Sequence, residues 1–66
     1  HGTREFVIRF ADALPAEMRT VIILYALQGM QYEEIAEVTR TSVGTVKSRI
    51  FFTRQRLQSQ LHDFIA

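Results

Sequence analysis

Residues 31–50 read QYEEIAEVTRTSVGTVKSRI, two helical patterns separated by a short polar break. In the first pattern Ile35 and Ala36 follow Tyr32 at the spacing of one helix face, and the glutamates fall outside that face. The second pattern begins after Ser42, a residue type that favours the N-cap of a helix. A short helix, a tight turn and a longer helix are typical of a helix-turn-helix unit.

The longer helix is expected to run over residues 42–63, with two chemically different faces. Its apolar face contains Val43, Val46, Ile50, Leu57, Leu61 and Phe64. The opposite face carries Thr45, Ser48, Phe52 and Gln55, flanked by Lys47, Arg49, Phe51 and Arg56. Small and hydroxyl side chains let a helix N-terminus approach the major groove, where cations reach phosphates or guanine edges. This pattern predicts a recognition helix, and a solvated basic helix is the alternative.

The first thirty residues predict two more helices. Thr3 is expected to cap a helix over residues 3–13, and the Leu14-Pro15 pair interrupts it. Pro15 suits the first position of a second helix over 15–28, which Gly29 should end. With helices over 31–38 and 42–63, the sequence predicts a compact all-α domain of four helices. The residues expected to be buried together are Leu24, Leu27, Ile35, Ala36, Val43, Val46 and Ile50.

Composition excludes several kinds of protein. Sixty-six residues make one domain, expected over 3–66, with His1-Gly2 as a remnant outside it. With no cysteine and only two histidines near opposite ends, we expect no metal, no cofactor and no disulfide. The longest apolar run, Val21 to Leu27, is too short to span a membrane. No histidine lies near a nucleophile and no glycine-rich phosphate loop is present, so we expect no enzyme; a cytoplasmic location is also expected.

Charge is polarised along the chain. Up to Glu37 there are three basic and six acidic residues, a net charge of −3; beyond it there are five basic residues and one acidic residue, a net charge of +4. The second half is therefore suited to face an anion, most simply a phosphate backbone.

Three motifs in fixed order closely resemble region 4 of bacterial sigma factors, especially the extracytoplasmic-function type. They are LPAEMR (residues 14–19), YEEIAE (32–37) and VGTVKSRI (43–50) followed by Arg54, and the resemblance covers residues 14–61. It implies a domain that reads the minus-35 promoter element and docks on the flap of the RNA polymerase β subunit. It also implies control by an anti-sigma protein, and a whole factor needs a second domain for the minus-10 element, so an isolated domain is expected.

The resemblance also implies where DNA is bound. The groove positions are Thr45, Lys47, Ser48 and Arg49, with Phe51 and Phe52 in the next turn. From the residues themselves, we expect further DNA contacts from Arg40, Thr41, Ser42 and Arg56. Phe52 stands where the family usually has a basic residue; it either touches a thymine methyl, alters promoter preference, or is an ordinary exposed aromatic. Arg40 and Ser42 replace turn residues of the family, and Gln31 replaces its serine cap. Arg54 is expected to pair with Glu33 or Glu34, with a phosphate contact as the alternative.

The helix over 15–28 is apolar on two sides, so the side away from the core is either covered by the helix over 3–13 or open to a protein partner. The second alternative predicts a protein-binding surface on the side away from the recognition helix. Its expected residues are Phe6, Phe10, Leu14 and Ile23. The flap and an anti-sigma protein are the expected partners of this surface. Two alternatives remain for the whole chain. One is a LuxR-type response-regulator output domain, which shares a Thr-Val-Lys piece, and the other is a sigma-like decoy that binds only proteins.

Overall fold

The computed structural model describes residues 2–65, with the surroundings of side chains described for residues 2–60. The chain forms four helices: α1 (Gly2–Asp12), α2 (Ala16–Ala26), α3 (Tyr32–Thr39) and α4 (Val43–Ile65). The predicted all-α fold of four helices is confirmed, and every predicted boundary is within two residues of the observed one. The predicted apolar positions Leu61 and Phe64 lie beyond the described side chains.

The two N-terminal junctions differ slightly from the predictions. Thr3 lies inside α1, which begins at Gly2, so it does not cap this helix. Pro15 has an extended ψ of 151° and is the N-cap of α2 instead of its first helical residue. Its carbonyl still accepts a hydrogen bond from the Arg19 amide at 2.9 Å, which starts the helical ladder.

Gly29 ends the second helix as predicted. It has a φ of +67°, a left-handed conformation that costs glycine nothing. The reversal lets the Met30 amide donate to the Leu24 carbonyl at 3.1 Å, satisfying a backbone acceptor at the end of α2. The chain then turns directly into α3.

The core is built where α2, α3 and α4 meet. It consists of Val21, Ile35, Ala36, Val46 and Ile50, all buried, with Leu24, Tyr25, Met30, Tyr32 and Val43 packed against it. The prediction was right for most of its members, but Leu27 is only partly buried and outside this cluster, and Val21 was missed. Because α2 is apolar nearly all round, its sequence does not single out the side that faces the core.

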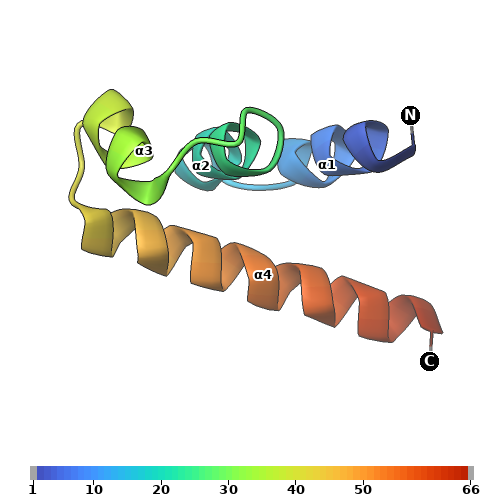
Figure 1. Cartoon of the computed structure of the whole chain (residues 1–66). Coiled ribbons are helices and arrows are strands. Elements are labelled where there is room, and N and C mark those ends of the chain that lie inside the picture. The colour runs from blue at the N-terminus through green and yellow to red at the C-terminus, as the bar shows by residue number, and fades with distance from the viewer. Residues whose placement is uncertain (1, 66) are drawn as a thin grey trace.

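The helices form two layers (Figure 1). In that view α1, α2 and α3 follow one another in a row, and the long α4 runs beneath them. Helix α1 packs against α2, whereas α2 and α3 both pack against α4. The start of α1 and the end of α4 both lie away from the α3–α4 turn, which leaves that turn at one end of the molecule. None of the helices in the described part is long and apolar enough to cross a membrane.

Candidate nucleic-acid interface

The turn between α3 and α4 is held by its own hydrogen bonds. Arg40 adopts a left-handed conformation (φ 57°, ψ 44°), which reverses the chain at the end of α3. The Thr41 amide donates to the Ala36 carbonyl at 2.9 Å, and the hydroxyls of Thr39 and Thr41 lie 2.9 Å apart. The sequence lacks a glycine here, and an arginine takes the conformation that glycine would favour.

Ser42 caps the N-terminus of α4, as predicted. Its Oγ accepts a hydrogen bond from the Thr45 amide at 3.1 Å and lies 3.0 Å from the Thr45 hydroxyl. The cap satisfies one of the free amides at the start of the helix. It also fixes the hydroxyl of Thr45, one of the predicted groove residues, beside that of Ser42.

Helix α4 has the predicted register. Val46 and Ile50 are buried, at 0% and 2% exposure, while Ser48 and Lys47 are exposed on other sides of the helix. One turn further on, Phe51 and Phe52 are 56% and 54% exposed, and Arg56 is exposed as well. The structure therefore brings Lys47, Ser48, Phe51, Phe52 and Arg56 together along the accessible side of one helix.

Other predicted contacts lie at the edges of this surface. Arg40 and Ser42 are exposed in and beside the turn, whereas Thr41 and Thr45 are only partly so. Arg49 is also half-buried, and it lines a hollow of about 300 Å³ together with Glu17, Thr20, Val38 and Thr39. Arg49 thus lies beside residues of α2 and α3, away from the centre of the exposed face of α4.

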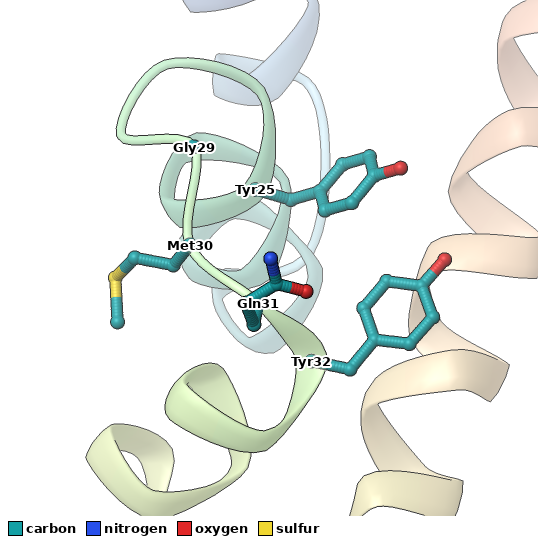
Figure 2. Close-up of a pocket in the computed structure, with 5 residues that line it drawn as sticks. All are labelled: Tyr25, Gly29, Met30, Gln31 and Tyr32. Carbon is teal, nitrogen blue, oxygen red and sulfur yellow. The ribbon is translucent and has the colours of Figure 1, made fainter.

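Arg54 has a different partner from the one predicted. Its Nη2 donates to the Tyr25 hydroxyl at 3.1 Å, and its guanidinium lies 5.8 Å from the centre of the Tyr25 ring. The Tyr25 and Tyr32 rings lie 5.6 Å apart, and both point toward α4 in Figure 2. Arg54 therefore links α4 to α2 through an aromatic pair that the sequence pattern did not predict. The sequence signal that could have indicated this contact is that Tyr25 follows Val21 by one turn of α2, which places both on the side of α2 that faces α4.

The start of α3 is capped from inside the helix. The Gln31 amide donates to Glu34 Oε1 at 2.9 Å, and the two residues form a capping box at the start of α3. Glu34 thus supplies half of a capping box and offsets part of the weaker capping expected from glutamine. An open hollow of about 420 Å³ lies beside this cap (Figure 2). It is lined by Gly29, Met30, Gln31 and the two tyrosines.

The predicted protein-binding residues divide into two groups. Phe10 and Leu14 are buried, at 7% and 3% exposure, so they belong to the packing between α1 and α2. Phe6 is 48% exposed and stacks on Phe10, with ring centres 6.3 Å apart, and Ile23 is half-buried. Only Phe6 and Ile23 of the four thus retain substantial accessible surface.

Comparison with known proteins places these features in a family. Residues 7–57 match the family described as sigma-70, region 4. The chain belongs to this family. The match includes α2, α3, the turn and the part of α4 that carries the exposed face described above. It favours region 4 over a LuxR-type output domain, in agreement with the resemblance of the three motifs.

Several relatives are sigma factors of the same type. The chain is 40% identical over 62 residues to the ECF RNA polymerase sigma-E factor of Escherichia coli strain K12, an alignment that covers 94% of the chain and 32% of that protein. It is 44% identical over 52 residues to the sigma-E factor of Haemophilus influenzae, covering 79% of the chain and 28% of the relative. The region 4 chain thus spans about a third of the length of these relatives.

Proposed function

We propose that this region 4 domain binds the minus-35 element of a promoter through α4 and docks on the RNA polymerase β flap. In this role it is the promoter-recognition domain of an alternative sigma factor. The observation that carries the proposal is the pairing of family membership with an exposed, acid-free face on α4. Residues 43–62 contain no aspartate or glutamate, so nothing on this part of the helix repels a phosphate backbone.

Geometry supports a major-groove approach of the α4 N-terminus. The first turn carries Gly44, where an added Cβ would meet only the Ser42 hydroxyl at 3.8 Å, so the backbone there is open to a close neighbour. Ser48 and Lys47 are exposed directly after it. A helix of this width fits the major groove, and its N-terminal dipole favours phosphate.

Salt dependence tests the electrostatic part of the proposal. If Arg40, Lys47, Arg49 and Arg56 contribute to neutralising about three to five phosphates, the log-log slope of affinity against salt is about −3 to −4.5. The slope is measured by fluorescence anisotropy on a labelled promoter duplex. An affinity that stays constant from low to moderate salt would contradict a phosphate-facing α4.

A matched pair of charge variants locates the interface. Lys47→Ala removes one exposed cation from the first turns of α4 and is expected to reduce the salt slope by about 0.9. Arg9→Ala removes the same charge from the exposed surface of α1 and should leave the slope unchanged. Equal effects of the two variants would indicate that only net charge matters, which argues against a defined DNA face.

Docking on the flap is the second part of the proposal. Phe6 and Ile23 supply apolar surface on α1 and α2, and the acidic surplus of residues 1–37 suits a partner helix with apolar and basic residues. Phe6→Glu should weaken capture by an immobilised flap segment while circular dichroism shows unchanged helicity. An anti-sigma protein using the same surface would compete with the flap. A chain that binds the flap but no promoter DNA would be a protein-binding decoy.

A further inference from the structure

Two neighbouring aromatic side chains on α4 are largely exposed in the described part of the chain. Phe51 and Phe52 are 56% and 54% exposed, and their rings meet edge to face with centres 5.6 Å apart. They follow Ser48 by three and four residues, so they lie one turn further along the same side of the helix. Such exposure is unusual for two adjacent large apolar groups, because each forgoes the free energy of burial.

The surroundings of the two rings favour a nucleic-acid occupant. Lys47 and Arg56 are exposed on the flanks of this face, and the next acidic residue along the helix is Asp63. Cations beside exposed aromatic rings suit a surface that holds phosphates at its edges and bases at its centre. A protein partner covering the same rings would have to be acidic, and it is an outcome that the experiment below separates.

We propose that Phe52 selects thymine in the bound duplex as the specificity-determining residue, with Phe51 supporting its ring. This inference rests on the proposed promoter binding and names the base that this part of α4 prefers. A phenyl ring has no hydrogen-bond donor or acceptor, so guanine, cytosine and adenine edges gain nothing from it. Thymine alone presents a methyl group in the major groove, and apolar side chains contact that group.

The position of the rings limits which bases they reach. Ser48 lies about one turn of α4 before Phe52, a distance of about 5.4 Å along the helix axis. The two side chains should therefore face neighbouring base pairs rather than the same one. Phe51 supports Phe52 from the side through the edge-to-face contact. We therefore expect a thymine preference at one or two adjacent base pairs, next to the pairs read from the first turn.

The test begins with selection from a duplex pool that has a randomised core, using the 66-residue chain. Thymine should be enriched at one or two fixed positions of the selected sequences. The selected duplex is then remade with deoxyuridine at those positions, which removes only the C5 methyl group. Affinity should fall about fourfold per methyl, equivalent to about 0.8 kcal/mol.

A thermodynamic cycle assigns the methyl contact to a residue. In Phe52→Ala the uracil and thymine duplexes should bind equally, because the ring that contacts the methyl is gone. Val38→Ala is the matched control: Val38 is also exposed, at 62%, but belongs to α3, so this variant should keep the parent's preference for thymine. Circular dichroism checks that each variant retains its helices.

The outcomes separate this inference from the proposed function. Sequence-selective binding by the parent that is insensitive to the methyl groups overturns thymine selection and leaves promoter binding intact. A methyl effect of equal size in the parent and Phe52→Ala overturns the assignment to Phe52. A parent chain that selects no duplex, while an acidic peptide protects the two phenylalanines, overturns both and makes this face a protein-binding surface.

Discussion

At the scale of single residues, Arg40 departs most clearly from ordinary backbone geometry. It has a φ of 57°, in a region where a side chain with a Cβ is disfavoured by about 1 to 2 kcal/mol. The left-handed turn is nevertheless needed, because it brings the Thr41 amide back onto α3 and starts α4 in its observed direction. The strained residue therefore carries an exposed positive charge beside the N-terminus of α4.

Replacing Arg40 by glycine should separate stability from DNA binding. Arg40→Gly relieves the left-handed strain and should raise the free energy of unfolding by about 0.5 to 1 kcal/mol, since glycine's greater freedom in the unfolded chain offsets part of the gain. Urea denaturation measures this difference. Arg40→Ala is the control, because it removes the charge but keeps the Cβ; if it stabilises the chain equally, φ is not the cause. Both variants should bind DNA with a shallower salt slope.

At the scale of helices, the start of α4 and the end of α1 are each stabilised by one side chain that hydrogen-bonds to backbone atoms. Ser42 starts the recognition helix by accepting from the Thr45 amide. Arg19 ties α2 to the end of α1, with Nε donating to the Ala11 carbonyl at 3.3 Å and Nη2 donating to the Leu14 carbonyl at 3.1 Å. These contacts set where the helices begin and how consecutive helices are joined.

Two serines on α4 make a matched test of the cap. Ser42→Ala removes the N-cap acceptor and should lower the free energy of unfolding by about 1 kcal/mol. Ser48→Ala changes the same side chain at an exposed interior position, where alanine is the better helix former, and should be neutral or slightly stabilising. Thermal denaturation followed by circular dichroism compares them. Equal destabilisation by both changes would show that the Ser42 cap adds nothing.

The junction of α1 and α2 offers a second element-scale test. Arg19→Met keeps much of the aliphatic length but loses the hydrogen bonds to the Ala11 carbonyl in α1 and to the Leu14 carbonyl just after it, so we expect the free energy of unfolding to fall by about 1 to 3 kcal/mol. Arg9→Met, on the exposed surface of α1, should change stability by less than about 0.5 kcal/mol. Hydrogen exchange of the α1 amides should rise in Arg19→Met. Unchanged exchange there would mean that packing of Phe10 and Leu14 alone holds α1 in place.

At the scale of the whole molecule, a small core carries the stability of four helices. Five buried residues join α2, α3 and α4. Thr53 is also buried, and its hydroxyl is satisfied by donating to the Arg49 carbonyl at 2.7 Å. A chain of this size rarely has more than about 3 to 5 kcal/mol of stability from one hydrophobic core. Any large cavity in this core should therefore affect every helix at once.

Ile35→Ala tests how close the domain is to this limit. Ile35 is fully buried at the centre of the cluster, and truncation of such a residue costs about 2 to 5 kcal/mol. We expect a large unfolded fraction at room temperature, seen as loss of helical circular dichroism. Val38→Ala on the same helix, at 62% exposure, should remain folded. Retention of full helicity by Ile35→Ala would place the main source of stability outside this cluster.

The sequence by itself determined the four helices, the helix-turn-helix and the side of α4 that faces the core. Spacing of Val46 and Ile50, the Ser42 cap and the Gly29 stop are local signals, each read within one or two turns of helix. The order and spacing of the three motifs were also sufficient to indicate the family. For α4, a strongly two-faced helix, periodicity alone was sufficient to separate buried Val46 from exposed Ser48.

Tertiary structure decided the features that depend on contacts between distant residues. The choice of Val21 over Leu27 for the core was not encoded locally, because α2 is apolar on both sides and only packing against α3 and α4 selects one. The partner of Arg54 is Tyr25, which lies 29 residues away on α2, whereas the sequence favoured glutamates that are nearer along the chain. Burial of Phe10 and Leu14 accompanies the packing of α1 against α2. Such choices depend on three-dimensional packing, which helical periodicity does not specify.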